Sequence, residues 1–145
     1  MIPISYPATL KQDIRGKGYV VNFPDLPEAL TDGRTVPEAL TEAADCLQEA
    51  LAGRLVHKQD LPTPSRPRRG QYLVPVALYL APKVALYLAM REAGVTNSAL
   101  ARRLKCSETI IRRMLNPRRH TRAERLQEAL EAVGRRIVVA VDDAA

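Results

Sequence analysis

Apolar and polar residues alternate near the start of the chain with the two-residue period of a β-strand that is buried on one face. The alternation covers residues 4–10, and a second β-prone run at 19–23 follows a turn that contains Gly16 and Gly18. These two runs predict a hairpin. Pro7 has no backbone N–H to donate, so it predicts that the first strand lies at a sheet edge or at a bulge.

Two further β-prone runs follow along the chain. Residues 29–31 form a short third run inside a turn-rich segment, and residues 72–76 form a fourth run after a proline-rich loop at 61–70. We expect both runs to join the same sheet as the hairpin.

One long helix is expected between the third and fourth of these runs. Thr35 and Glu38 have the spacing of a capping box, in which a threonine side chain caps the helix and a glutamate lies three residues later. Apolar residues then recur at helical spacing as far as about His57 (Leu40, Ala44, Leu47, Leu51 and Leu55). The order of elements predicts an α+β fold, a small sheet with one helix packed on one face.

The periodicity changes in the second half of the chain, where helices dominate. Pro82 opens one helix, which is expected to end at Gly94. A later helix is expected from about Thr121 to Val133, with Thr121 and Glu124 as a second capping box and Gly134 after its end.

Between these helices, residues 97–116 read NSALARRLKCSETIIRRMLN, two short amphipathic helices joined by a tight turn. The spacing is typical of a helix-turn-helix that reads DNA. Ser107 is the expected N-cap of the second helix. Lys105 occupies the turn position where this motif often has glycine, so we expect a strained or altered turn. The apolar faces are expected to hold Leu100, Ala101 and Leu104 in the first helix and Ile111, Met114 and Leu115 in the second.

Polar side chains on and beside this motif are the candidate DNA contacts, because they can reach base edges and phosphates. They are Asn97, Ser98, Ser107, Glu108, Thr109, Arg112, Arg113, Asn116, Arg118 and Arg119. The competing interpretation is a buried helical hairpin whose arginines are merely solvated.

The last β-prone run, residues 137–141, follows a helical domain in which it has no sheet to join. Two copies paired across a two-fold axis would satisfy it, which makes Ile137, Val138, Val139 and Val141 candidate dimerisation residues. Alternatively, the run folds back onto its own helices.

Charge divides the chain into two parts. Residues 1–65 hold 6 Lys and Arg against 9 Asp and Glu, whereas residues 66–145 hold 16 against 7. A basic half suits a polyanion such as DNA, and an acidic half suits a different, basic partner.

Candidate catalytic chemistry is sparse. The two histidines, His57 and His120, lack metal-ligand spacing or a nucleophile. Nothing brings four aspartates together on Mg²⁺ as a nuclease would require (Asp13, Asp25, Asp32 and Asp45). Cys46 and Cys106 lie at apolar helix positions, typical of a reducing compartment. We expect a cytoplasmic protein with no enzymatic activity, metal or cofactor.

The run GYVVNFPDLPEALTDGRTVPEALTEAADCLQEAL (residues 18–51), with the proline loop, the return strand and the helical half that follow, resembles the HicB family of bacterial antitoxins. The resemblance implies a partial RNase H-like domain without catalytic activity, which binds a small mRNA-cleaving HicA toxin. It also implies a C-terminal domain of Cro/repressor type that represses the operon of the pair. Within this loop-rich run the candidate toxin contacts are Phe23, Asp25, Glu28 and Asp32.

The sequence therefore predicts a toxin-binding domain at residues 1–80 and a helix-turn-helix and dimerisation domain at 81–145. The predicted partners are a HicA-like toxin, double-stranded operator DNA and a second copy of the chain. Two alternatives remain open, a one-component transcription regulator with an N-terminal ligand-sensing domain and an interaction scaffold in which the helix-turn-helix is only structural.

Overall fold

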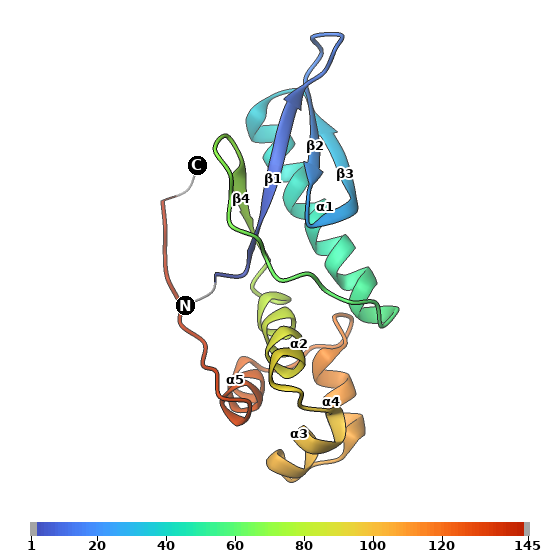
Figure 1. Cartoon of the computed structure of the whole chain (residues 1–145), viewed down its shortest axis with the longest axis vertical. Coiled ribbons are helices and arrows are strands. Elements are labelled where there is room, and N and C mark those ends of the chain that lie inside the picture. Colours follow the sequence, from blue (N-terminus) through green and yellow to red (C-terminus); the bar gives the residue numbers. More distant parts are fainter. Residues whose placement is uncertain (1–2, 144–145) are drawn as a thin grey trace.

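The computed structural model describes residues 3–143, and it has a sheet-bearing half and a helical half (Figure 1). The α+β prediction is confirmed. The elements are β1 (Ser5–Gln12), β2 (Tyr19–Phe23), β3 (Leu26–Gly33), α1 (Val36–Val56), β4 (Tyr72–Pro75), α2 (Ala81–Ala93), α3 (Asn97–Leu104), α4 (Glu108–Leu115) and α5 (Ala123–Ala132).

The four strands form one antiparallel sheet in the order β3-β2-β1-β4. β1 is an inner strand, so the edge position predicted from Pro7 is wrong for the strand as a whole. Residues 5–8 of β1 pair with β4, whereas residues 9–12 pair with β2. At Pro7 the strand therefore has a paired neighbour on one side only, and the missing N–H is tolerated there.

The third strand is longer than predicted, because it covers eight residues where the sequence indicated three. Pro27, Asp32 and Gly33 are typical of turns, so the sequence pattern did not indicate a strand here. β3 lies at the edge of the sheet, where such residues are tolerated. The pairing of β3 with β2 also changes register between Asn22 and Phe23. A bulge of this kind breaks the two-residue period on which strand prediction depends.

Helix α1 begins as the capping-box spacing predicts. The hydroxyl of Thr35 accepts a hydrogen bond from the backbone N–H of Glu38 at 3.2 Å. The carboxylate of Glu38 returns to the N–H of Arg34 at 3.3 Å, one residue before the cap, and not to Thr35 itself. One half of the predicted box is thus present, and the other half is displaced by one residue.

Small residues bring α1 close to the sheet. The fully buried row of α1 is Ala39, Ala43, Leu47 and Leu51, which is shifted by one position at its start from the predicted row. A Cβ atom on Gly33, at the end of β3, would lie 2.4 Å from the backbone nitrogen of Ala39. Glycine is therefore required here by the close approach of strand and helix.

Helix α2 belongs to both hydrophobic cores. Leu80, just before it, and Val84, on its first turn, are buried in the core of the sheet and α1. Leu86 and Met90 are buried in the core that α2 forms with α3, α4 and α5. The predicted domain boundary at 80/81 stays a prediction, because α2 supplies side chains to both sides of it.

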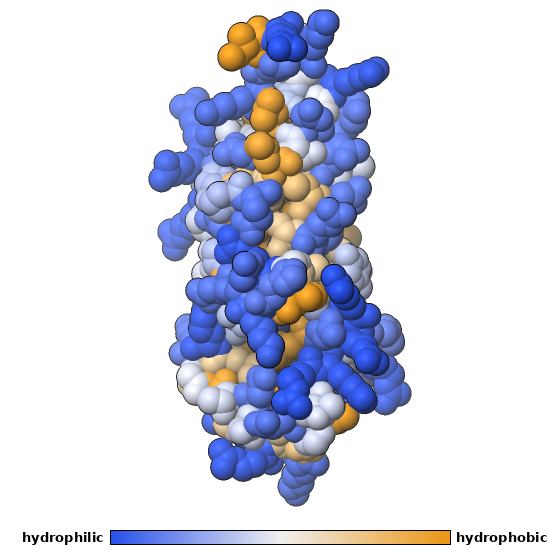
Figure 2. Space-filling model, turned by 90° about the vertical axis from the view of Figure 1, so that its right-hand side faces the viewer, coloured by the Kyte–Doolittle hydropathy of each residue, from blue (hydrophilic) through white to orange (hydrophobic). Residues whose placement is uncertain are grey.

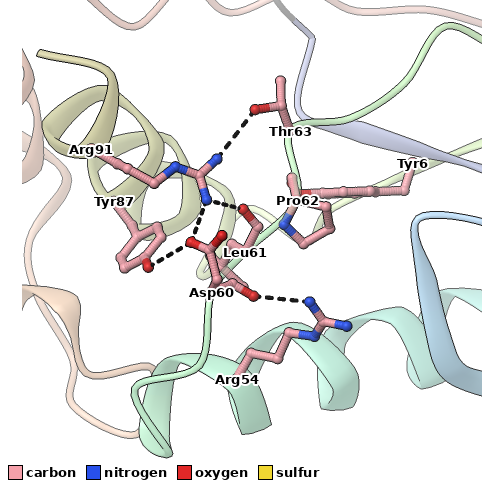
Figure 3. A network of polar contacts seen from close by, with 8 residues as sticks. All are labelled: Tyr6, Arg54, Asp60, Leu61, Pro62, Thr63, Tyr87 and Arg91. Carbon is pink, nitrogen blue, oxygen red and sulfur yellow. Dashed lines mark hydrogen bonds and ion pairs between the residues drawn. The ribbon is translucent and has the colours of Figure 1, made fainter.

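Polar contacts also tie α2 to the segment that crosses between the two halves (Figure 3). The Arg91 guanidinium donates to Asp60, to the carbonyl of Leu61 and to Thr63, and the Tyr87 hydroxyl contacts Asp60 at 3.2 Å. These bonds fix the crossing segment against α2 from one side. The Tyr6 hydroxyl donates to the carbonyl of Pro62 at 2.7 Å and fixes it against β1 from the other side.

The helical half departs from the predictions at two places. Helix α5 begins at Ala123, and Thr121 does not cap it, because the Thr121 hydroxyl instead accepts a hydrogen bond from Lys83 at 3.0 Å. The run at 137–141 is not a strand in the single chain, since none of the sheet strands pairs with it. Ile137 packs half-buried against the helical core, as the fold-back alternative expected for the run, but Val139 and Val141 are 78% and 95% exposed.

The turn after α3 has the strain that the sequence indicated, because a lysine takes the conformation that glycine would adopt more easily. Lys105 takes the left-handed conformation, with φ 55° and ψ 45°. This conformation costs a non-glycine residue about 1–2 kcal/mol. A glycine at this position would avoid that cost, but its greater conformational freedom in the unfolded chain would lower the free energy of unfolding by about 0.5–1 kcal/mol.

We therefore expect Lys105→Gly to raise the free energy of unfolding by about 0.5–1 kcal/mol. Chemical denaturation of the two proteins measures the difference. Gly94→Ala is the matched opposite, because Gly94 ends α2 at φ 66° with open space around its Cβ position, and it should destabilise. Equal destabilisation by both changes would contradict the strain assigned to Lys105.

Candidate functional site

Helices α3 and α4 form a compact unit whose inner faces are apolar. Leu100, Ala101, Ile111 and Met114 are buried, and Leu104 and Leu115 are half-buried, in agreement with the predicted faces. The hydroxyl of Thr96 caps α3 by accepting from the N–H of Ala99 at 3.1 Å. Ser107 is the N-cap residue of α4, as predicted, but its hydroxyl makes no capping hydrogen bond and is exposed.

Most candidate DNA contacts are exposed on α3, α4 and the loop after α4, which together are called the candidate DNA-contact region. Asn97 and Asn116 are half-buried, and the other eight are exposed: Ser98, Ser107, Glu108, Thr109, Arg112, Arg113, Arg118 and Arg119. The surface over the helical half is mostly hydrophilic in side view (Figure 2). A polar and exposed outer face is what a helix that contacts nucleic acid requires.

Several of these side chains contact one another in the free protein. The carboxylate of Glu108 lies 3.6 Å from the Arg112 guanidinium and accepts a hydrogen bond from Ser98. Arg112 also donates to Thr109 at 3.1 Å. Exposed pairs of this kind contribute about 0–1 kcal/mol, so they can open at little cost when a stronger acceptor approaches.

Three arginines of the region have no such internal partner. Within residues 3–143, no carboxylate lies within ion-pair distance of Arg113, Arg118 or Arg119. Arg118 and Arg119 stand on a loop that Asn116 shapes, since its side chain accepts from the N–H of Arg118 at 2.9 Å. Their charges therefore face solvent uncompensated, directly after α4.

Sequence reasoning missed one residue beneath this region. The Lys83 side chain is 2% exposed and donates to backbone oxygens at the end of α4. Burial lowers the pKa of this ammonium to about 8. The only signal in the sequence is a lysine between the apolar residues Leu80 and Val84 at the start of a helix.

The four candidate toxin contacts have different roles in the fold. Phe23 is 1% exposed and belongs to the core. Asp25 accepts hydrogen bonds from the N–H and the hydroxyl of Ser65, at 2.9 and 3.0 Å. Glu28 forms a two-bond pair with Arg54, which lowers the pKa of the Glu28 carboxyl below its ordinary value.

Asp32 is exposed, and unlike Asp25 and Glu28 its side chain makes no hydrogen bond or ion pair with the residues that the structure describes. It lies on a cleft of about 260 Å³ that also contains Asp13, Lys17, Arg34 and Glu38. The cleft is charged and open, so it lacks the enclosed apolar pocket on which a ligand-sensing regulator would depend.

Two further kinds of feature, metal sites and membrane-spanning helices, are absent from the described part of the chain. Residues 3–143 contain no group of three His, Cys, Asp or Glu side chains placed to hold a metal ion. Over the same residues, no helix has both the length and the apolar character needed to span a membrane.

Comparison with known proteins agrees with the resemblance seen in the sequence. Residues 5–85 match the family described as HicB_like antitoxin of bacterial toxin-antitoxin system. The chain is 36% identical over 132 residues to Antitoxin HicB of Escherichia coli K12, covering 91% of this chain and 95% of that protein. It is 35% identical over 132 residues to Antitoxin HicB 2 of Photorhabdus laumondii, covering 91% and 92%. Both the matched family and the length of these alignments show that the chain belongs to the HicB-like antitoxin family.

Proposed function

We propose that this chain neutralises a HicA-like toxin through its sheet-bearing half and represses its own operon through α3 and α4, used as a helix-turn-helix. Family membership supports the antitoxin role and implies a toxin partner. The DNA-binding role depends on one observation above all. Arg112 and Arg113 stand exposed on the outer face of α4, and the uncompensated Arg118 and Arg119 follow on the next loop.

The two arginine pairs suit different parts of a DNA duplex. An arginine on a helix that lies in the major groove can donate two hydrogen bonds to a guanine. Arginines on a loop at the end of that helix are placed to reach the phosphate backbone. Lys105, exposed in the turn that joins α3 to α4, adds a further positive charge to this unit.

The charge of the sheet-bearing half supports a basic protein partner. A toxin that grips RNA carries positive charge, and a complementary acidic surface accelerates encounter. Because Asp25 and Glu28 already have partners inside the chain, Asp32 is the candidate contact best able to pair with such a toxin.

Co-expression tests the whole proposal. Cells that express the small protein encoded beside this chain should stop growing, and co-expression of this chain should restore growth. The purified chain should also retard a DNA fragment taken from upstream of its own gene. An unchanged growth defect would refute the antitoxin half of the proposal, and no retardation would refute the repressor half.

We expect Asp32→Lys to weaken toxin binding by about tenfold or more, because it replaces an attractive charge pair with a repulsive one. Titration of the toxin into each variant measures the effect. Glu124→Lys, which makes the same charge change on α5, is the control and should bind toxin normally. Normal binding by Asp32→Lys would place the toxin surface elsewhere.

A further inference from the structure

Lys83 donates hydrogen bonds both to the end of α4 and to the loop that follows it, which a nonpolar residue could not do. Its ammonium lies 2.8 Å from the carbonyl oxygen of Met114, 3.0 Å from that of Asn116 and 3.4 Å from that of Arg113. The last carbonyls of a helix have no partner within the helix, and a cation there also interacts favourably with the helix dipole. Helix α4 thus ends on a lysine supplied by α2.

The same ammonium also holds the far side of the loop that follows α4. It donates to the Thr121 hydroxyl at 3.0 Å, while Asn116 marks the near side. Residues 117–120, which include Arg118 and Arg119, lie between these two anchor points. The carbonyl of Asn116 additionally accepts from the N–H of Arg119 at 3.1 Å, so the loop is folded onto the oxygen that Lys83 contacts.

All four acceptors of Lys83 are neutral oxygens, and none of the ion pairs found in residues 3–143 includes it. A buried ammonium without a carboxylate is costly, whereas a methionine would fill a similar volume without that cost. What only the lysine provides is a three-donor contact that joins the helix end to the loop. Lys83 lies on the first turn of α2, next to the buried Val84. The contact therefore connects the end of α4 and its loop to a helix that packs in both cores.

We propose that Lys83 is a positioning residue for DNA binding, which holds the loop of Arg118 and Arg119 at a fixed place relative to the reading helix α4. The inference depends on the proposed repressor function and adds to it a residue that does not touch DNA. It acts on the phosphate contacts of the loop, while Ile111 and Met114, buried in the helical core, also hold α4 in place.

The test compares Lys83→Met with the unchanged chain and with Lys58→Met, which removes the same charge from an exposed lysine of the other half. Binding to a short DNA duplex of mixed sequence is titrated at several salt concentrations, well below the unfolding temperature of each protein. Lys83→Met should reduce the slope of log affinity against log salt by up to about 2, because up to two phosphate contacts are lost. Between low and physiological salt, the ratio of the affinities of the unchanged chain and of Lys83→Met should therefore change by about tenfold. Lys58→Met should change neither quantity.

A double-mutant cycle separates positioning from plain stabilisation. If Lys83 acts through the loop, Lys83→Met should have little further effect on DNA affinity once Arg118→Ala and Arg119→Ala are present. Additive losses, or an unchanged salt slope in Lys83→Met, would overturn the inference even if the protein is less stable.

Thr121→Val provides the same test with a smaller change, should Lys83→Met fail to fold. It removes one acceptor of Lys83 and should lower the salt slope in the same direction, and an unchanged slope would contradict the inference. If the unchanged chain itself failed to bind DNA, the proposed repressor function would be at fault and not the role of Lys83.

Discussion

Replacing Arg112 and Arg113 with alanine is expected to abolish selective binding of the chain to its operator. Each arginine that contacts a base contributes about 1–3 kcal/mol of discrimination. Both side chains are exposed on α4, and among residues 3–143 Arg112 has only weak contacts, with Glu108 and Thr109. A gel-shift titration against operator and unrelated DNA should show that the variant binds both with similar, low affinity.

The matched control is Arg68→Ala with Arg69→Ala, an adjacent pair of exposed arginines in the loop before β4. It removes the same charge and should leave operator selectivity intact. Arg118→Ala with Arg119→Ala should differ from both, because it should weaken binding to every sequence alike and flatten the salt dependence. Selective operator binding by the Arg112→Ala/Arg113→Ala variant would refute the assignment of α4 as the reading helix.

The parts of the fold that sequence reasoning recovered are those where local chemistry decides the structure. Thr35 starts α1 because its hydroxyl finds the N–H three residues later, and Gly94 ends α2 because it accepts the left-handed conformation. The α3–α4 unit was recovered for the same reason, since its apolar spacing and its turn lie within a few residues. Lys105 was a correct warning of strain in that turn.

The failures occurred where a distant part of the chain decides. Thr121 has the sequence of a helix cap, yet its hydroxyl is taken by Lys83, thirty-eight residues earlier. Phe23, one of the candidate toxin contacts, lies on the buried face of β2 and packs in the core, and toxin contact at this residue stays a prediction. Asp25 and Glu28 stay candidate toxin contacts, but nothing in the sequence indicated that their carboxylates bond to Ser65 and Arg54 within the chain. Pairings of this kind leave no periodic signal in the sequence.

The C-terminal tail, residues 137–141, was also predicted to be a strand, but in the single chain none of the sheet strands pairs with it. If this segment is extended when it pairs, residues two apart share a face, so Ile137, Val139 and Val141 would lie on one side. Only Ile137 packs against the helical core, and the two valines remain exposed. We propose that a second copy covers them by antiparallel pairing across a two-fold axis, which would also provide the two reading helices that a two-fold operator needs.

Truncation after Ile137 is therefore expected to convert the protein to monomers and to reduce operator affinity by about a hundredfold or more, because two linked half-site contacts become independent. The cut retains Ile137 and the contact of Arg135 with Glu92 at 2.7 Å, so the helical core should stay folded. Sedimentation measures the oligomeric state, and toxin binding should be unchanged.

A pair of full-length variants tests whether the shared face is what matters. Val139→Lys with Val141→Lys places two charges on the face of Ile137 and should reproduce the truncation. Val138→Lys places one charge on the opposite face and should have the smaller effect on dimerisation. If the truncated chain instead sediments as a dimer and binds operator with full affinity, the dimer is formed elsewhere, and the exposed valines of the tail have another role.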